Sequence, residues 1–445
     1  MVTFDDVLTT LLQVCETTSG FSPDKVVVVR DLRGRVRLAL KQKSGGLIVS
    51  DLVASLRSAL GAWFEEPILV HGGSPGLTRL CAVVLDVNSP WRNPAWVDAA
   101  TGQAKQPVAG RWHLVERHIS KTAWVGDSKA APPWPLVSSK PPIVTFYSFK
   151  GGVGRTTALA AAAWHLAEQG KRVVVVDLDV EAPGAGSLMG ASADRGVLDF
   201  LVDHAASGSS DLDRMIAPAL ELGGSAAQVD VVPSGRLDSS YFEKLARLDY
   251  TGSGLLKPNS ESPVREGMVA LLNALARRDP KPDYIFLDSR AGLHDVAGLS
   301  LHDLAHVDVL VGRDSDQNYR GLELTVEALG RRRRPADLRS IVVQTMAPED
   351  LKSAEYKRVT EEYRLRSHRA FVEHVYSLEE PIDPVTDADP IADDSSAAHY
   401  PHVIRFNNRL VSFTALSGMR SELFSDDFAQ FVEKLKGLCG PEVAS

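Results

Sequence analysis

Apolar and polar residues follow two different patterns along the chain, and the pattern changes near residue 140. In the first part, apolar residues recur at helical spacing from Phe4 to Cys15, and short β-rich runs are separated by turns. The expected helices and strands of this part lie at 4–15, 25–30, 35–40, 51–63, 68–70 and 80–86. These elements predict a small accessory α/β domain over residues 1–125, in which no catalytic motif is found.

Beyond that point, strands, loops and helices alternate. A helix expected over 156–169 ends at Gly170, and the run 173–177 is apolar up to its last residue, as in a strand covered on both faces. The expected strands lie at 143–148, 173–177, 284–288, 307–312, 341–344 and 371–376. The alternation predicts an α/β fold with a doubly wound, mostly parallel sheet over residues 143–445.

A proline-rich segment, residues 126–142, separates the two patterns and contains five prolines. Proline fits neither the interior of a helix nor a central strand, so the segment indicates a semi-rigid linker between two domains. A long surface loop inside one domain is the alternative interpretation.

Composition narrows the class of protein. The chain has 49 basic and 57 acidic residues, a net charge of −8, which argues against binding nucleic acid with the whole surface. Its three cysteines lie far apart, which excludes a metal site built on cysteine spacing and fits a reducing compartment. The N-terminus shows no signal-peptide pattern, and no apolar run approaches the roughly 18 residues of a membrane helix. We therefore expect a cytoplasmic protein.

A glycine-rich segment, 149–157 (FKGGVGRTT), follows one expected strand and opens an expected helix. Glycines allow backbone N–H groups to point at phosphate oxygens, and the helix N-terminus adds partial positive charge. Arg155 stands where a lysine usually spans the β- and γ-phosphates, and the Thr156 hydroxyl stands where it would bind Mg²⁺. The strict P-loop spacing is not met, so a plain glycine-rich turn is the alternative. The expected phosphate-binding residues are Gly151, Gly152, Val153, Gly154, Arg155, Thr156 and Thr157.

The longer run 146–160, FYSFKGGVGRTTALA, resembles the deviant Walker A loop KGGxGK(S/T)T of the ParA/MinD ATPases. It is more closely similar to a bacterial subfamily that carries KGGVGR in that place. The resemblance implies a P-loop NTPase domain from Ile143 towards the C-terminus. It also implies a catalytic role for Lys150, because the lysine at this place in the family reaches into the nucleotide site, often across a dimer interface.

Two aspartates, Asp177 and Asp179, follow the apolar strand that begins at Val173. Strand ends in open α/β sheets face the ligand crevice, where one carboxylate can hold Mg²⁺ and another can orient an attacking water. The resemblance places Asp177 near Mg²⁺ and makes Asp179 the residue that positions the catalytic water. The alternative is that Asp179 or Glu181 caps a turn.

A third acidic strand end is Asp288, in the run YIFLD, which is typical of a Walker B strand with its carboxylate near Mg²⁺. Residues 289–292 would then form a switch that senses the γ-phosphate. Arg290 stands where the relatives commonly have proline. It could contact phosphate or a partner carboxylate, or it could anchor the loop through a salt bridge. His294 is expected to be structural.

Base recognition has a weaker signal. No NKxD guanine signature is present, and in the relatives a residue near the end of a late strand contacts adenine. Gln344 or Thr345 lies at that place, so ATP with Mg²⁺ is the expected ligand.

Three further segments have a structural and a functional interpretation. The run Arg331–Arg334 could bind DNA, or it could complement a helix dipole. The acidic, proline-rich residues 379–394 are expected to form an exposed loop. The C-terminal helix around Phe428 lacks a strongly basic face, so we expect it to pack onto the sheet and not to bind a membrane.

Together these features predict a molecular switch that binds and slowly hydrolyses Mg-ATP. ATP would close a homodimer, hydrolysis would open it, and an unidentified protein partner, recognised by the N-terminal domain, would read the state. The alternative is a nucleotide sensor without hydrolysis, because arginine and lysine are not interchangeable at a phosphate site. Members of the subfamily resemble components of bacterial signalling or conflict systems, which is an analogy only.

Overall fold

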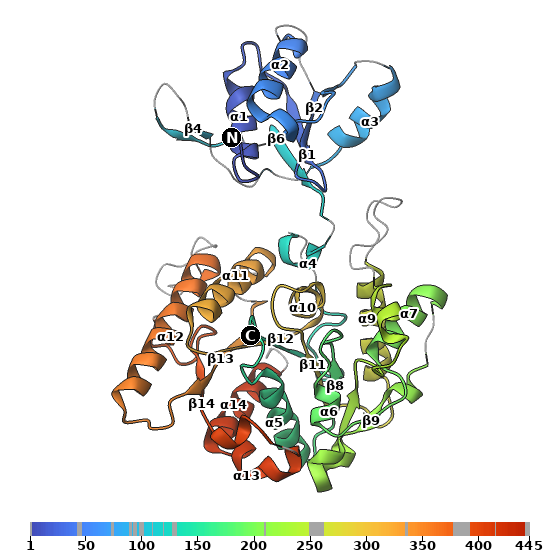
Figure 1. Ribbon diagram of the computed structural model, residues 1–445, viewed down its shortest axis with the longest axis vertical. Helices are drawn as coiled ribbons and strands as arrows, with labels where there is room; N and C mark the ends of the chain where they lie inside the picture. Colours follow the sequence, from blue (N-terminus) through green and yellow to red (C-terminus); the bar gives the residue numbers. More distant parts are fainter. Residues whose placement is uncertain are drawn as a thin grey trace. The chain divides into compact units, whose positions relative to one another are not determined.

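The computed structural model divides into two compact units, Met1–Ile119 and Ser120–Ser445, each with its own sheet and core (Figure 1). The residues that it describes are 2–41, 47–72, 75–88, 91, 96–97, 102–108, 110–118, 120–126, 131–208, 211–248, 262–333, 337–376, 392–413 and 415–440.

The first unit is a four-stranded sheet, in the order β3-β2-β1-β6, with helices on both faces. The strands pair in parallel except for the antiparallel pair β1 and β2. The strands are β1 (Lys25–Arg30), β2 (Val36–Lys41), β3 (Leu69–Val70) and β6 (Trp112–Glu116), and a separate pair is β4 (Trp96–Val97) and β5 (Ala104–Lys105). The helices are α1 (Val7–Thr17), α2 (Val49–Leu60), the 3₁₀ turn η1 (Gly61–Trp63) and α3 (Pro75–Leu85).

The strand predicted at 80–86 is wrong, because residues up to Leu85 belong to helix α3. Cys81 and Leu85 are four residues apart, both are buried, and both pack in a cluster with Val27 and Ala39 of the sheet. A short apolar run fits a strand or a buried helix equally well, and only the neighbouring sheet decides between them.

The second unit contains an eight-stranded sheet in the order β14-β13-β12-β7-β11-β8-β10-β9. All neighbours pair in parallel except β9, which runs antiparallel to β10. The predicted doubly wound, mostly parallel sheet is therefore confirmed. The strands are β7 (Ile143–Tyr147), β8 (Val173–Asp177), β9 (Ala217–Pro218), β10 (Val229–Val232), β11 (Tyr284–Asp288), β12 (Val307–Gly312), β13 (Ser340–Ala347) and β14 (His402–Arg405).

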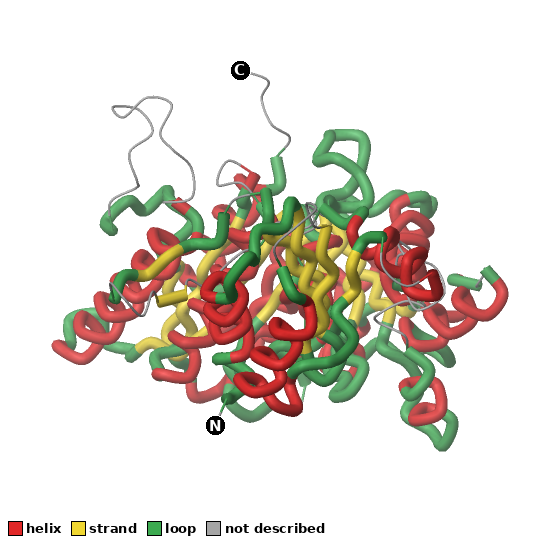
Figure 2. The backbone as a smooth tube through the Cα atoms, turned by 90° about the horizontal axis from the view of Figure 1, so that it is seen from above, coloured by secondary structure: helices red, strands yellow, loops and turns green. Residues whose placement is uncertain are grey.

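Helices cover both faces of this sheet (red around the yellow strands in Figure 2). One face packs on α5 and α14, and the other packs on α7 and α9 towards one edge and on α11 and α12 towards the other. The helices are α4 (Thr122–Val125), α5 (Arg155–Glu168), α6 (Ala185–Leu188), α7 (Val197–Ser207), α8 (Tyr241–Leu245), α9 (Pro263–Ala276), α10 (Asp295–Leu299), α11 (Asp316–Arg332), α12 (Ala354–His374), α13 (Arg420–Leu423) and α14 (Asp426–Leu438). Short 3₁₀ or π segments are η2 (Asp213–Met215), η3 (Leu220–Gln228), η4 (Ser300–Leu304), η7 (Asn408–Leu410) and η8 (Leu416–Met419).

Two apolar segments near the C-terminus are helical. The strand predicted at 371–376 is wrong, because α12 continues to His374 and buries Phe371 against the same cluster as α11. Helix α14 buries Phe428 and Phe431 in the core beside α5, so its apolar face packs onto the sheet as expected. No helix in the described part of the chain has the length and apolar character to cross a bilayer.

The proline-rich segment folds onto the second unit from residue 131 onward. Trp134 is buried, and its Nε1–H donates to the carbonyl oxygen of Pro141 (3.0 Å). His306 ties it to the sheet: its Nε2 lies 2.7 Å from Trp134 O, and its Nδ1 accepts the Ile143 N–H (2.9 Å). The second half of the expected linker is thus part of a packed unit, and the two units divide before it, at Ile119. The division into functional domains stays a prediction.

The arginine run after α11 is bound within the second unit as far as it is described. Arg331 pairs with Glu327 (2.9 Å), and the buried Arg332 pairs with Asp303 (2.9 Å). Arg333 pairs with the buried Asp308. Arg334 lies outside the described residues, as does most of the predicted acidic loop 379–394. The three described arginines are therefore structural, which weakens the DNA-binding interpretation.

Candidate functional site

The glycine-rich segment forms the loop between β7 and α5. Gly152 and Gly154 have φ angles of 73° and 82°, which glycine adopts without strain. Nothing lies within 4 Å of a Cβ built on Gly151, Gly152 or Gly154, so the loop borders open space. Gly154 is the N-cap of the 14-residue helix α5. The loop therefore lies at the positively polarised end of a long helix, where anions bind.

Arg155, the first residue of α5, joins this loop to two of the predicted aspartates. Its Nε–H donates to Asp288 Oδ1 (2.8 Å), and its Nη2 lies 3.3 Å from Asp179 Oδ2. The Thr156 hydroxyl donates to the second oxygen of Asp288 (2.9 Å). The Arg155 side chain is 10% exposed and that of Asp288 only 1%. The phosphate loop and the ends of β8 and β11 thus meet at one buried charged centre.

Burial perturbs the pKa values of this centre. It raises the pKa of Asp288, and the nearby Arg155 and Thr156 only partly oppose that effect. Burial also acts to lower the pKa of Arg155, but the charges of Asp288 and Asp179 outweigh it and raise the pKa overall. The guanidinium therefore stays charged. The Thr156 hydroxyl and the Asp288 carboxylate are adjacent oxygen donors of the kind that Mg²⁺ prefers, so these residues fit that metal.

Asp177 is buried at the end of β8 and holds the loop that follows it. Its oxygens accept the N–H groups of Asp179 (3.1 Å), Gly184 (3.1 Å) and Ala185 (3.0 Å). Burial and the nearby charge of Asp288 raise its pKa to about 7. The residue predicted to lie near the metal is therefore close to Asp288, but its oxygens are used by the backbone.

Asp179 caps a turn, as in the alternative interpretation, and its role in positioning a catalytic water stays a prediction. Its Oδ1 accepts the Ala182 N–H (3.2 Å), as in a capped turn, while its Oδ2 faces Arg155. Arg290 anchors the neighbouring loop: its Nη1 lies 2.7 Å from Glu181 Oε2 and 4.0 Å from Asp179 Oδ1. Thus the salt-bridge interpretation of Arg290 describes the structure, and the guanidinium also borders the charged centre.

His294 binds the other oxygen of the same glutamate. Its Nε2 lies 2.7 Å from Glu181 Oε1, and its Nδ1 accepts the Val296 N–H (3.4 Å). These partners assign the neutral tautomer with the proton on Nε2. Burial lowers the pKa of His294, although Glu181 partly opposes this. His294 therefore has the structural role that was expected, at a junction between the loops after β8 and β11.

Lys150 differs from Arg155 in its contacts with the described residues. Its side chain is half-buried, and it forms no ion pair or hydrogen bond to any residue that the structure describes. A lysine beside the loop is therefore available to a group outside the described chain.

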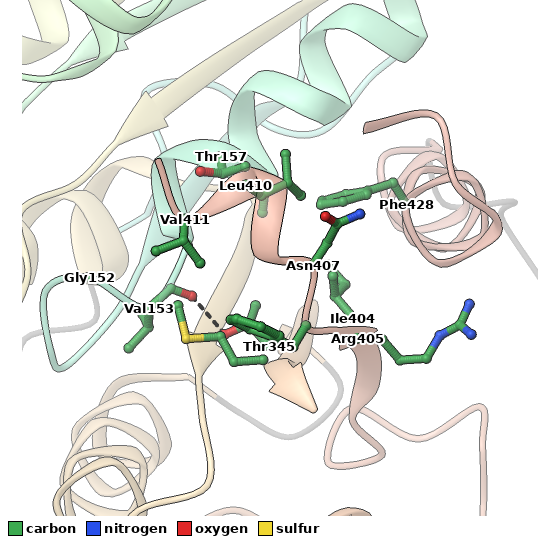
Figure 3. A pocket seen from close by; sticks show the side chains of 14 residues that line it. Gly152, Val153, Thr157, Thr345, Ile404, Arg405, Asn407, Leu410, Val411 and Phe428 are labelled. Atoms are coloured by element: carbon green, nitrogen blue, oxygen red, sulfur yellow. Dashed lines mark hydrogen bonds between the residues drawn. The ribbon is translucent and has the colours of Figure 1, made fainter. Parts of the chain in front are cut away.

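A pocket of about 270 Å³ opens beside the phosphate loop (Figure 3). Ligand pockets commonly measure about 300–1,000 Å³, so this one suits a single flat ring system rather than a whole nucleotide. Its walls come from the loop and the start of α5, the end of β13, the segment after β14, and α14. The lining residues are Gly152, Val153, Gly154, Thr157, Ala158, Thr345, Met346, Ile404, Arg405, Phe406, Asn407, Leu410, Val411 and Phe428.

Thr345 lines this pocket, whereas the predicted Gln344 does not. The Thr345 hydroxyl lies within hydrogen-bonding distance of the carbonyl oxygens of Val153 (2.7 Å) and Gly312 (3.0 Å). Gln344 is fully buried and donates its amide N–H to Val359 O of α12 (3.3 Å). Consecutive residues on a strand face opposite sides of the sheet, so only one of the two can border the pocket.

The segment after β14 was missed at the sequence level. Asn407, Leu410 and Val411 face the phosphate loop across the pocket, and Phe428 closes its side (Figure 3). The run HVIRF at 402–406 is a short β-rich signal that could have suggested one more strand. Nothing in the local pattern places that strand beside β13, so its loop could not be assigned to the site.

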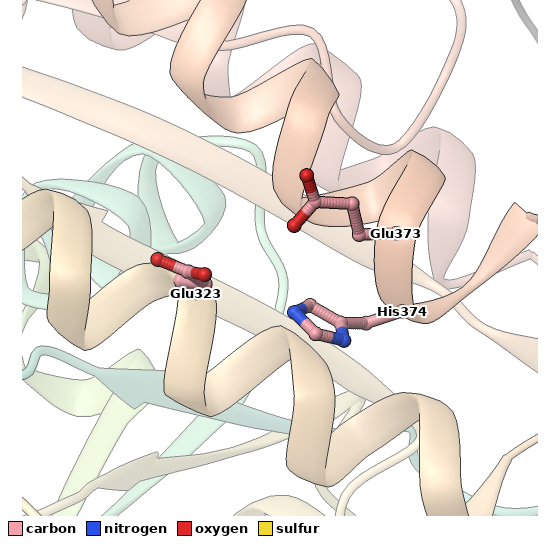
Figure 4. A group of neighbouring side chains, drawn as sticks. All are labelled: Glu323, Glu373 and His374. Atoms are coloured by element: carbon pink, nitrogen blue, oxygen red, sulfur yellow. The ribbon is translucent and has the colours of Figure 1, made fainter. Parts of the chain in front are cut away.

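A second cluster of polar side chains lies between α11 and α12. Glu323 on α11 faces Glu373 and His374 near the end of α12 (Figure 4). Their possible ligand atoms lie within 4.8 Å of one another, but both glutamates are exposed. Exposed acidic groups gather without an ion in many proteins, and the cluster shares no residue with the loop or the strand ends described above.

Comparisons with known proteins were made for the whole chain. A family model described as the CobQ/CobB/MinD/ParA nucleotide binding domain matches residues 144–381, more than half of the 445 residues. The septum site-determining protein MinD of Escherichia coli (strain K12) is 44% identical over 59 residues, which is 13% of this chain and 22% of that protein. MinD of Buchnera aphidicola matches to the same extent. The chain thus spans only 22% of the length of these curated relatives.

Solved structures that are similar share little sequence with the chain. A plasmid partition protein from Borrelia burgdorferi is 15% identical and covers 66% of this chain and 99% of its own, with a TM-score of 0.40. A ParA family ATPase from Chlorobium tepidum TLS is 17% identical, covers 66% and 98%, and has a TM-score of 0.42. Cobyrinic acid a,c-diamide synthase from Mycobacterium smegmatis, with bound ATP analog and magnesium, is 18% identical, covers 51% and 82%, and scores 0.36. At such scores the likeness carries no argument about ligand or activity.

Proposed function

Since the chain belongs to the CobQ/CobB/MinD/ParA nucleotide-binding domain family, and is in that sense a P-loop ATPase of the ParA/MinD type, we propose that it is a switch driven by Mg-ATP. The observation that carries this proposal is the buried centre in which Arg155 and Thr156 meet Asp179 and Asp288 beside the phosphate loop. Loop amides, a cation and carboxylates within one site are what a metal-bound triphosphate requires.

The adjoining pocket divides the nucleotide between two halves of the site. The phosphates lie on the loop 151–157, and the base enters the pocket between Val153 and Leu410. The pocket walls are mostly apolar, as a base needs, while the Asn407 amide and the Thr345 hydroxyl supply polar atoms at its edge. Adenine is the base we propose, which makes ATP the ligand.

Thr156 and Asp288 would hold Mg²⁺, because they are the adjacent oxygen donors at the end of the loop. The metal would supply charge neutralisation and orientation of the phosphates. We assign Asp179 to position an attacking water, because its Oδ2 faces Arg155 in the charged centre, whereas its Oδ1 accepts the Ala182 N–H. Arg155 would exchange one carboxylate partner for a phosphate oxygen, which conserves its charge pairing.

Hydrolysis is tested by measuring phosphate release from Mg-ATP by the purified full chain and by Asp179→Ala. We expect slow release by the wild-type chain and at least a tenfold loss in the variant, with ATP binding kept. Asp194→Ala is the matched control, because Asp194 is 70% exposed and forms only a surface pair with Arg214. Equal rates in wild type and Asp179→Ala would contradict the assigned role of Asp179.

A nucleotide sensor without hydrolysis is the second candidate, and one observation favours it. Arg155 engages Asp288 and Asp179 together, so both carboxylates are already paired with a cation. If that pairing persists with ATP bound, neither acid is free for metal or water. Tight ATP binding with no phosphate release, alone or with a protein partner, would support this candidate over the enzyme.

Dimerisation with nucleotide is also part of the proposal. Lys150, which has no partner among the residues that the structure describes, supports it, because a lysine beside the loop can reach the phosphates of a facing protomer. Light scattering after size exclusion should show a dimer with a non-hydrolysable ATP analogue and a monomer for Lys150→Ala. A wild-type chain that stays monomeric at saturating analogue would contradict this part.

A protein partner is proposed to bind the N-terminal unit. Helix α3 leaves Leu80 46% and Val83 64% exposed, which is apolar surface that a partner could cover. Replacing both by serine should abolish binding of the partner and leave ATP affinity unchanged.

A further inference from the structure

Helix α4 (Thr122–Val125) is the first helix after the N-terminal unit, and it lies beside α10, which follows the loop at the end of β11 (Figure 1). Resting on the function proposed above, we propose that α4 is a latch that the nucleotide site releases. Residues 289–295 hold α4 while Arg290 pairs with Glu181, and a bound triphosphate draws Arg290 away and frees the helix.

The first observation is how α4 is held. The Trp124 Nε1–H donates to the carbonyl oxygen of His294 (2.7 Å), and the Lys121 ammonium lies 2.9 Å from Asp295 Oδ2. The Lys121 backbone N–H donates to the other oxygen of Asp295. All three contacts are made to His294 and Asp295, the consecutive residues at the start of α10, so the position of the start of α10 decides whether α4 is bound.

Helices α4 and α10 are closely packed against each other. Trp124 is only 4% exposed, and a Cβ built on Gly298 would lie 2.7 Å from its Nε1 and 3.1 Å from Ala123 Cβ. The indole also packs against Tyr147 and the edge of His302. A small displacement of the start of α10 therefore breaks this contact, because close-packed surfaces do not deform gradually.

Lys121 is held in a strained conformation. Its φ and ψ angles are 63° and 22°, in the left-handed region that residues with a side chain rarely occupy. Such a conformation is energetically unfavourable and persists only where surrounding contacts impose it. At Lys121 those contacts are both oxygens of Asp295. Loss of the Asp295 contact thus removes the cause of the strain, and the latch is biased to open.

The loop that holds α4 begins at the nucleotide site. Asp288 ends β11, Arg290 follows two residues later, and His294 comes four residues after that. Arg290 and His294 each bind one oxygen of Glu181, with distances of 2.7 Å in both cases. Glu181 therefore fixes the loop at two points, one next to the charged centre and one next to α4.

The negative charge of a bound triphosphate determines the direction in which Arg290 would move. In the structure, Arg290 Nη1 lies 2.7 Å from Glu181 but also 4.0 Å from Asp179, which faces Arg155. A triphosphate adds several negative charges to that centre, and a guanidinium pairs strongly with phosphate oxygens. Arg290 would leave Glu181 for the phosphate, and the segment between Arg290 and His294 would move with it.

The other side of α4 is bound to a part of the fold that the nucleotide does not touch. Arg331 Nη2 donates to Trp124 O (3.1 Å), and Arg332 donates to Ala123 O. Arg332 is itself paired with Asp303 (2.9 Å). Released from the loop, α4 would stay tethered by its carbonyl groups, so the change is local. Because α4 begins at Thr122, three residues after the end of the N-terminal unit at Ile119, the released segment is the one that leads into that unit.

Hydrogen exchange of the full chain, measured by mass spectrometry with and without a non-hydrolysable ATP analogue and Mg²⁺, tests the latch. Two peptides are followed, one over the phosphate loop and one over residues 120–126. We expect protection of the loop peptide and at least threefold faster exchange of the α4 peptide. A protected loop with unchanged or slower exchange in α4 would overturn the latch and leave the proposed function intact. An unprotected loop would overturn both.

Arg290→Ala identifies the route. At an analogue concentration that saturates the variant, the loop peptide should be protected, while the α4 peptide should exchange fast with or without the analogue. Arg320→Ala is the matched control, an exposed arginine on α11 outside the site, and should behave as wild type. If Arg290→Ala does not fold, Trp124→Phe keeps an aromatic side chain and removes the N–H donor. Its α4 peptide should exchange fast without nucleotide, and a wild-type response in either variant would overturn the proposal.

Discussion

The two halves of the proposed nucleotide site differ in polarity and in exposure to solvent. The phosphate half is a closed network in which Arg155 binds Asp288 and Asp179, with exposures of 10%, 1% and 11%. The base half is an open, mostly apolar pocket in which Val411 is 62% exposed. The phosphate half is defined by ion pairs between buried side chains, and the base half by the shape of an apolar pocket. Affinity for triphosphate and selectivity for the base should therefore respond to different substitutions.

The largest effect is expected for Arg155→Ala in the phosphate half. It leaves the buried Asp288 and Asp179 without their cation, and removing one partner of a buried ion pair typically costs about 3–5 kcal/mol. We expect the free energy of unfolding, from urea denaturation at neutral pH, to fall by roughly that amount, with ATP binding lost. Arg155→Lys keeps the charge and should lose less. Unchanged stability of Arg155→Ala would show that the network does not hold this half together.

Filling the base half should separate the two halves. Val411→Trp places an indole in the pocket and should weaken ATP binding at least tenfold, while inorganic triphosphate binds as before. Titration calorimetry with both ligands measures the difference. Val83→Trp is the matched control, a valine of similar exposure (64%) in the N-terminal unit. Equal losses for ATP and triphosphate would contradict the division of the site.

Among the residues that the structure describes, no carboxylate lines the base pocket, whereas the phosphate half contains Asp177, whose pKa is raised. Burial and Asp288 raise the pKa of Asp177 to about 7 in the folded chain, from an ordinary value of 3.8. The folded state therefore binds the extra proton, and this stabilisation is present below pH 3.8 and lost as pH rises through about 7. In nucleotide-free buffer with EDTA, the free energy of unfolding of wild type relative to Asp177→Asn should fall between pH 5 and pH 7. A difference that is independent of pH would contradict the buried, protonated carboxyl.

The smallest effect concerns the two neighbours on β13. Thr345→Val removes the hydroxyl that bonds to Val153 O or Gly312 O, which costs about 1 kcal/mol and should weaken ATP binding a few-fold. Gln344→Met should leave ATP affinity within twofold, because that side chain is buried on the opposite face. Calorimetry on the pair checks this. A larger loss of affinity in Gln344→Met would support the role in adenine binding that the sequence predicted for Gln344.

The same division explains what the sequence could predict. The phosphate half comes from short, contiguous motifs at strand ends, so Arg155, Thr156, Asp179 and Asp288 were predicted together and lie together. The base half is assembled by β14 and the loop behind it, and only the pairing of β14 with β13 brings that loop to the site. Local periodicity contains no information about such pairing.

In the fold, too, features set by the local sequence pattern were predicted, and features set by contacts distant in sequence were not. Long alternating strands and helices predicted the sheet of the second unit, whereas the short apolar runs at 80–86 and 371–376 were read as strands and are helical. The arginine run 331–334 looks like a surface patch, yet Arg332 and Arg333 reach Asp303 and Asp308. Those acids lie more than twenty residues earlier in the chain, so their partners were not evident from the run itself.

Titration calorimetry of the full chain with ATP and Mg²⁺ tests the central claim most directly. The account predicts binding of one ATP per chain, lost in Arg155→Ala and weakened in Val411→Trp, with triphosphate affected by the first substitution only. A folded wild-type chain that binds no ATP at millimolar concentration, or that binds ATP unchanged in both variants, would contradict it.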